Sequence, residues 1–162
     1  FQKIQEAFDC LEGVQRRFQI RGEFRGITVL DDYGHHPTEI RATLNALRGC
    51  WPERRIVVVF QPHRYSRTKA LFDEFTTSFY QADRLFLLPI YPAGEDSIDG
   101  VDSEHLLEGI KEKGHREVKF FSTRTEVIPS LLGMLKSGDV LVTLGAGDVW
   151  KIGQEIVSAA GA

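Results

Sequence analysis

Short apolar runs alternate with segments of helical periodicity along almost the whole chain. Runs of aliphatic and aromatic residues are typical of strands, whereas apolar residues three or four positions apart are typical of helices. Strands are expected at residues 16–20, 27–32, 56–60, 84–88, 118–121 and 140–144, and helices at 4–11, 37–49, 66–80, 103–113, 125–135 and 149–160. The two glycines within residues 21–26 predict a turn or hairpin between the first two strands.

This alternation predicts an α/β fold. Strands separated by helices form βαβ units with right-handed crossovers, and such units build parallel sheets. Residues 56–60 are hydrophobic throughout, as expected of a strand that is covered on both faces. We therefore expect a Rossmann-like, mostly parallel sheet of about six strands with helices on both faces. The 162 residues suit a single domain, residues 1–162, with a sizeable core.

Composition argues against several classes of protein. The hydrophobic share of 42% and the charged share of 27% are ordinary for a globular protein. A net charge of -3 gives no basic field, so nucleic acid is not an expected partner. No apolar run is long enough for a membrane helix, and two cysteines are too few for a disulfide framework, so we expect a cytoplasmic protein with no membrane partner. The chain begins at Phe1 rather than at methionine, which suggests a domain of a longer protein.

Polar side chains gather after three of the expected strands. Residues 31–39 (DDYGHHPTE) follow the second strand, residues 61–67 (QPHRYSR) follow the third, and residues 145–148 (GAGD) follow the last. The carboxyl ends of parallel strands share one edge of a sheet, which is where α/β proteins bind their ligands. We therefore expect these three segments to form one surface.

Arginines and histidines in these segments are candidate ligand-binding groups. Arg64 and Arg67 lie three residues apart at the start of an expected helix, on one side of its first turn. Guanidinium groups bind carboxylate or phosphate in a bidentate way, so the pair is a candidate anion clamp; two solvated arginines are the alternative. His35 and His36 are adjacent and point in different directions, so no shared metal site is expected. His115 is expected on the surface.

Two phosphate-binding signatures are incomplete or absent. Residues 145–147 (GAG) resemble half of a dinucleotide turn, but Trp150 stands where the third glycine would be. Tight turn geometry is the expected reason for these glycines. The chain has no G-x-x-x-x-G-K-[ST] loop, so it has no evident means of gripping the phosphates of ATP by itself.

Five motifs, in order along the chain, resemble the C-terminal domain of the Mur ligase family. They are residues 13–18 (GVQRRF), 31–39 (DDYGHHPTE), 60–68 (FQPHRYSRT), 91–95 (YPAGE) and 145–148 (GAGD), and together they span nearly the whole chain. Within the family they look most like the members that join L-alanine to UDP-N-acetylmuramate. The resemblance implies the C-terminal domain of a three-domain cytoplasmic ligase of peptidoglycan precursor synthesis.

The resemblance also implies a reaction and a division of labour. ATP phosphorylates the carboxyl group of UDP-N-acetylmuramate, and the amine of L-alanine attacks the acyl phosphate to give an amide and phosphate. The enzyme's own central domain would hold the phosphate loop and the Mg2+ ligands, and its N-terminal domain would hold the UDP-sugar. No catalytic residue is assigned to this C-terminal domain, which is expected to fold but not to ligate alone.

Particular residues receive binding roles from the same resemblance. Arg17 is expected to reach the ATP phosphates and Asp32 the ribose, although Asp31 could exchange roles with Asp32. The alanine end of the site is expected to be lined by Tyr33, His35, His63, Arg64 and Arg67. An arginine suits that end because it fixes the carboxylate of alanine while the amine stays free to attack.

Three alternatives stay open. A murein peptide recycling ligase is similar around the two histidines but is not expected to carry residues 62–67 (PHRYSR). A Rossmann-like module could bind a nucleotide or an acidic metabolite without chemistry, which the missing phosphate loop favours. An oxidoreductase on the same fold rests on residues 145–147 alone.

Overall fold

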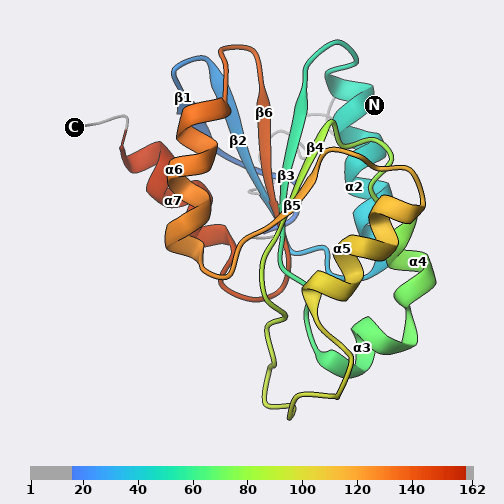
Figure 1. The fold of residues 1–162 in the computed structure, drawn as a ribbon. Coiled ribbons are helices and arrows are strands. Elements are labelled where there is room, and N and C mark those ends of the chain that lie inside the picture. Colours follow the sequence, from blue (N-terminus) through green and yellow to red (C-terminus); the bar gives the residue numbers. More distant parts are fainter. Residues whose placement is uncertain (1–15, 160–162) are drawn as a thin grey trace, which may run out of the picture.

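Six strands form a single sheet in the computed structural model, which describes residues 16–159 (Figure 1). In chain order the strands are β1 (Gln19–Phe24), β2 (Ile27–Asp32), β3 (Ile56–Phe60), β4 (Arg84–Leu87), β5 (Val118–Phe120) and β6 (Val140–Leu144). Their order across the sheet is β1-β2-β6-β3-β4-β5. Every neighbouring pair is parallel except the antiparallel pair of β1 and β2. The expected mostly parallel sheet is confirmed.

Helices cover both faces of this sheet (Figure 1). The helices α2 (Pro37–Cys50), α4 (Phe72–Thr76) and α5 (Ser103–Glu112) pack on one face, together with Val58 and Phe60 of β3. On the other face, α6 (Arg124–Met134) and α7 (Trp150–Ser158) pack with Val57 and Val59 of the same strand. All four of these β3 side chains are 0% exposed. The predicted burial of this strand on both sides is therefore confirmed.

The hairpin of β1 and β2 is longer than expected. Residues 21–26 were expected to turn, but β1 continues to Phe24 and the turn consists of Arg25 and Gly26. Both turn residues have positive φ, 49° and 76°, as in the two-residue turns that join twisted antiparallel strands. Gly22 lies within the strand instead, where a Cβ atom would come within 3.0 Å of Val157 on α7. Its glycine therefore allows a close helix–sheet approach rather than a turn.

The prediction of a single helix at residues 66–80 is wrong. The chain forms two short helices there, α3 (Tyr65–Ala70) and α4, separated by Leu71 at φ -116° and ψ 28°. Apolar spacing fits a broken helix as well as a continuous one, because each turn still buries its own residues. Phe75 and Phe79 are buried as expected, at 0% and 1% exposed.

Other expectations are met closely or fall outside the structure. The helices α2, α5, α6 and α7 begin and end within two residues of their expected bounds.

The expectation that His115 lies on the surface is wrong. His115 is buried, and its Nε2 lies 3.0 Å from the carbonyl oxygen of Ala82. The helix expected at residues 4–11 lies outside the described residues. No helix within residues 16–159 is long and apolar enough to cross a membrane.

Candidate functional site

The carboxyl ends of β2, β6 and β3 lie side by side. Asp32 at the end of β2 and Phe60 at the end of β3 both pair with Leu144 at the end of β6. Contact continues beyond the strands, because the Gly145 amide donates to the Asp32 carbonyl at 3.2 Å and the Gln61 amide donates to the Leu144 carbonyl at 3.0 Å. The expected convergence of three polar segments on one sheet edge is confirmed.

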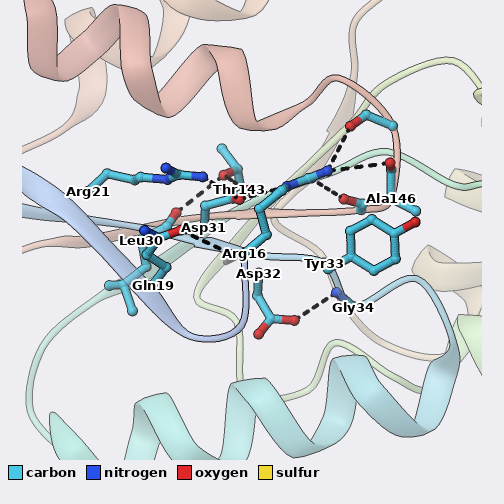
Figure 2. Close-up of polar contacts among 12 residues, drawn as sticks. Arg16, Gln19, Arg21, Leu30, Asp31, Asp32, Tyr33, Gly34, Thr143 and Ala146 are labelled. Carbon is cyan, nitrogen blue, oxygen red and sulfur yellow. Dashed lines mark hydrogen bonds and ion pairs between the residues drawn. The ribbon is translucent and has the colours of Figure 1, made fainter. Parts of the chain in front are cut away.

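Asp31 is a fully buried carboxylate at this edge. Its Oδ2 lies 2.9 Å from Nε of Arg16 and 3.2 Å from Nη2 of Arg21. Its Oδ1 accepts a 2.8 Å hydrogen bond from the hydroxyl of Thr143 on β6 (Figure 2). A buried charge needs such partners because an unpaired carboxylate is costly to desolvate. Asp31 is thus held inside the fold, with its carboxylate turned away from solvent.

Asp32 uses its side chain to shape the loop that follows β2. Its Oδ2 accepts a 2.8 Å hydrogen bond from the Phe18 amide, and its Oδ1 accepts a 2.7 Å bond from the Gly34 amide. Glycine at position 34 leaves room for this carboxylate, because a Cβ atom there would lie 2.8 Å from Oδ1. Each carboxylate oxygen has more than one lone-pair position, so Asp32 keeps acceptor capacity beyond these two bonds.

Arg16 makes more contacts at this edge than Arg17, although the sequence resemblance gave a role only to Arg17. Figure 2 shows the guanidinium group of Arg16 between Asp31 and the loop after β6. In that loop it donates to the carbonyl oxygens of residues 145, 146 and 147, at 2.6, 3.4 and 3.2 Å. Its guanidinium carbon also lies 5.0 Å from the centre of the Tyr33 ring. An adjacent pair of arginines in sequence does not reveal which one turns inward.

Four rings from three loops form a row across the same edge, which we call the aromatic row: Tyr33, His35, His63 and Tyr91. Tyr33 meets His35 edge-on with ring centres 5.2 Å apart, and His35 lies 5.4 Å from His63. His63 stacks on Tyr91 at 5.6 Å with only 6° between the ring planes. Tyr91 belongs to the segment after β4, and its role was not foreseen, although it lies in the motif of residues 91–95.

His63 is the polar centre of the aromatic row. Its Nδ1 lies 3.3 Å from Nη1 of Arg67, a group that only donates, so the neutral ring carries its proton on Nε2. Burial lowers the pKa of His63, and the neighbouring His35, Arg67 and Arg64 lower it further. His63 is therefore a neutral hydrogen-bond donor near pH 7. Among residues 16–159, no hydrogen bond is made to its Nε2.

His35 has the opposite tautomer. Its Nδ1 lies 3.0 Å from the carbonyl oxygen of Tyr33, which only accepts, so the neutral ring has its proton on Nδ1. The Nε2 atom of His35 then carries a lone pair. The two histidines of the aromatic row thus offer one acceptor and one donor nitrogen.

Glu39 closes the loop at the start of α2. Its Oε2 accepts hydrogen bonds from the backbone amides of His35 and His36 at 3.0 and 3.1 Å. Nδ1 of His36 accepts from the Thr38 amide, which completes a capping box with histidine as the N-cap. Burial raises the pKa of Glu39, but hydrogen bonds from the two amides and from Arg17 outweigh it and hold the pKa below its usual value.

The three arginines with expected binding roles differ in accessibility. Arg17 keeps 47% of its side chain exposed, with one 3.2 Å contact to Glu39. Arg64 is exposed and has a left-handed backbone, with φ 73°. Arg67 is half-buried, and its Nη1 donates to the carbonyl and ring of His63. The structure thus brings Arg67 against His63 of the aromatic row and leaves Arg64 exposed.

A magnesium ion does not fit the described residues. No group of three or more His, Cys, Asp or Glu side chains within residues 16–159 is placed to hold a metal ion. The two acidic residues at the end of β2 already bind other groups: Asp31 pairs with two arginines, and Asp32 accepts from two backbone amides. Magnesium binding takes free carboxylate oxygens and waters, which this edge does not gather.

Comparison with protein families assigns the chain. The profile of the family described as "Mur ligase, glutamate ligase domain" matches residues 16–147. The chain belongs to the Mur ligase family. The matched residues include the aromatic row, Arg16 and the loop of residues 145–147, so the whole edge lies within this Mur ligase domain.

Curated relatives of this Mur ligase domain are close in sequence. The UDP-N-acetylmuramate--L-alanine ligase of Desulfosudis oleivorans is 58% identical over 158 residues, which are 98% of this chain and 35% of that protein. The enzyme of the same name from Geobacter sulfurreducens is 54% identical over 158 residues, covering 98% and 34%. The chain therefore spans about a third of the length of these curated relatives.

Solved structures share the fold of this Mur ligase domain. The UDP-N-acetylmuramate-alanine ligase MurC of Thermotoga maritima superposes with a TM-score of 0.77 at 28% identity, covering 95% of this chain and 32% of that one. The murein peptide ligase of Psychrobacter arcticus gives 0.75 at 24% identity, covering 96% and 32%. The second likeness shows the fold alone.

Proposed function

We propose that this domain supplies the amino-acid end of the active site in a ligase that joins L-alanine to UDP-N-acetylmuramate with ATP. The observation that carries the proposal is the aromatic row, in which His63 and Arg67 are fixed together at the converged strand ends. The names of relatives that are 54 to 58% identical over almost the whole chain support the choice of alanine.

The carboxylate of alanine is the group that His63 and Arg67 suit. Arg67 uses Nη1 for His63, which leaves Nη2 and Nε as donors in a forked arrangement that matches a carboxylate. The neutral His63 adds a hydrogen bond from Nε2 without adding charge. Arg64, which is exposed, is proposed to add a second cation, and Tyr33 and His35 are proposed to line the same site.

The ammonium group of alanine must lose one proton to become a nucleophilic amine. His35 offers a lone pair on Nε2 in the same row, so it is the proposed proton acceptor. The amine nitrogen then forms a bond to the acyl carbon, and the bond from that carbon to the phosphate oxygen breaks. Phosphate leaves with the electron pair of that bond and takes up the second proton of the nitrogen, which gives a neutral amide.

Residues near Tyr33 are proposed to bind the nucleotide. Arg17 is the proposed ligand of the ATP phosphates, which its accessible side chain, paired with Glu39, supports. Asp32 is the proposed acceptor for ribose hydroxyls through its remaining lone pairs. Asp31 is proposed to act on the nucleotide indirectly, through Arg16, because both of its oxygens are engaged.

The rest of the ligase is proposed to lie outside this chain. A central domain would hold the phosphate loop and the Mg2+ ligands, and an N-terminal domain would hold the UDP-sugar, in a cytoplasmic three-domain enzyme. The share of about one third of each relative's length supports this division. The 162-residue chain alone, residues 1–162, is then a single folded domain without ligase activity.

The test is an assay of the full-length protein with ATP and UDP-N-acetylmuramate. L-alanine and a muramyl tripeptide, L-alanyl-γ-D-glutamyl-meso-diaminopimelate, are offered separately, and ADP release and product mass are measured. Ligation of alanine but not of the tripeptide is expected. Preference for the tripeptide would favour a recycling ligase, and no ADP release with either would contradict the proposal. The 162-residue chain serves as a control that should not ligate.

A further inference from the structure

Arg16 makes more hydrogen bonds than its proposed role as the partner of Asp31 requires. One guanidinium group pairs with the buried Asp31 and donates to three successive carbonyl oxygens of the 145–147 loop. The same group covers the face of the Tyr33 ring. Arg16 therefore ties together two strand ends, those of β2 and β6.

The backbone of Arg16 is also fixed in an unfavourable conformation. Its φ of 62° lies in the left-handed region, which a residue with a side chain rarely adopts. Its carbonyl accepts a 2.6 Å hydrogen bond from the Tyr33 amide, and its own amide donates to Oε1 of Gln19 at 3.0 Å. Such strain persists where the surroundings enforce it, and it concentrates at functional sites.

Both ends of the aromatic row depend on groups that Arg16 touches. At one end its guanidinium lies over Tyr33. At the other end it holds the carbonyl of Gly147, a residue packed so tightly that a Cβ atom there would lie 2.8 Å from the Tyr91 ring. Tyr91 in turn stacks on His63. A shift of the 145–147 loop would therefore be transmitted to His63.

We propose that Arg16 is a positioning residue that fixes the 145–147 loop and thereby sets the spacing of the aromatic row from Tyr33 to Tyr91. It does not touch the amino acid itself. The kinetic consequence rests on the proposed function, since it needs alanine to bind at the row. A small misplacement of binding groups is enough to weaken productive binding, by about 100-fold for 1 Å in sensitive cases.

The chain contains a matched control in Arg21. Arg21 pairs with the same Oδ2 of Asp31 at 3.2 Å and its guanidinium carbon lies 6.0 Å from the centre of the Trp150 ring, but among the described residues it makes no hydrogen bond to the 145–147 loop. Arg16→Ala and Arg21→Ala thus each remove one cation from Asp31, and only the first releases the loop. Arg16→Lys keeps the charge but lacks the planar fork that reaches several carbonyls at once.

The test combines hydrogen exchange with kinetics in the full-length protein. Exchange is followed by mass spectrometry in peptides spanning residues 144–152, whose Gly145, Lys151 and Ile152 amides are hydrogen-bonded at the two ends of the loop. Arg16→Ala should speed this exchange about tenfold, because local opening governs it. It should raise the KM for L-alanine by about tenfold with a smaller change in kcat. Arg16→Lys should fall between Arg16→Ala and the unaltered protein, and Arg21→Ala should leave the exchange unchanged.

If Arg16→Ala and Arg21→Ala speed the exchange equally, the proposal is overturned. The common cause would then be the loss of one cation beside Asp31, not the release of the 145–147 loop. Unchanged exchange in Arg16→Ala would overturn it as well. If Arg16→Ala fails to fold, Arg16→Lys tests the proposal instead, through the same hydrogen exchange and the same KM for L-alanine. If the unaltered protein does not ligate alanine, the proposed function fails, but the exchange comparison still decides the role of Arg16.

Discussion

Asp31→Asn removes one buried charge and leaves two arginines facing a neutral amide. Removing one partner of a buried ion pair costs about 3–5 kcal/mol, because the remaining charge stays desolvated without its partner. Arg16 and Arg21 keep 18% and 27% of their side chains exposed, so water can partly replace the lost carboxylate. The free energy of unfolding should therefore fall by an amount near the lower limit, about 3 kcal/mol.

Urea unfolding of the 162-residue chain, followed by circular dichroism, measures this loss. With a slope of about 2 kcal/mol/M, the midpoint should fall by about 1.5 M. Glu117→Gln is the matched control, because Glu117 and Arg84 form a 2.6 Å pair whose side chains are 55% and 36% exposed. That exposed pair should contribute less than about 1 kcal/mol. A loss in Asp31→Asn no larger than in the control would refute the argument from burial.

Three further predictions concern the same edge. Folding lowers the pKa of His63 below 6.5, mainly through burial, so the free energy of unfolding should fall as the pH drops below that value. His63→Gln should reduce this dependence on pH, which is measured as the urea midpoint at a series of pH values. Equal slopes in both proteins would contradict this. The pKa of Glu39 is lowered below 4.5, so its stabilising contribution is complete above that pH and is lost as the pH falls through the folded value. Glu39→Gln should lose that acid-side slope in the same titration, and a retained slope would show that another carboxylate causes it. Gly147→Ala pushes a Cβ atom against Tyr91 and should raise the KM for L-alanine about tenfold in the full-length enzyme. Gly133→Ala is the control, because open space surrounds Gly133, and it should leave this KM unchanged. Equal KM values in the two variants would contradict the packing argument.

The meeting of the three polar segments could be predicted from sequence. Parallel strands end at the same edge, so residues that follow Asp32, Phe60 and Leu144 were expected along one edge once the strands were recognised. The hydrophobic runs were long enough to recognise each strand. Direct contact between the three segments also needs β6 to lie between β2 and β3, and that order could not be predicted from the sequence.

The division of labour between neighbouring residues could not be predicted. Alternation along a strand places Asp31 and Asp32 on opposite faces, but it does not tell which face holds the arginines. Likewise, Arg16 has a left-handed backbone and its side chain turns inward, whereas Arg17 stays accessible. Such a conformation depends on tertiary contacts, which no local pattern encodes.

Tyr91 shows a second limit of sequence reasoning. It reaches the aromatic row because its amide bonds the Pro62 carbonyl at 2.8 Å and its carbonyl accepts from the Arg64 amide at 2.9 Å. These bonds dock an irregular segment, and the path of such a segment has no periodicity to reveal it. The position of Tyr91 after an expected strand placed it near the edge without showing that it would stack on His63.

The most direct test of the proposed function is the KM for L-alanine in full-length Arg67→Ala, with Arg84→Ala as the surface control. A charge-assisted hydrogen bond contributes about 1.5–3 kcal/mol, so the KM for alanine should rise by about 10- to 100-fold. The KM for ATP should change by less than about twofold, since an effect confined to one substrate marks lost binding of that substrate. The control should change neither value. An unchanged KM for alanine in Arg67→Ala, or an equal rise for ATP, would contradict the assignment of this edge to the amino acid.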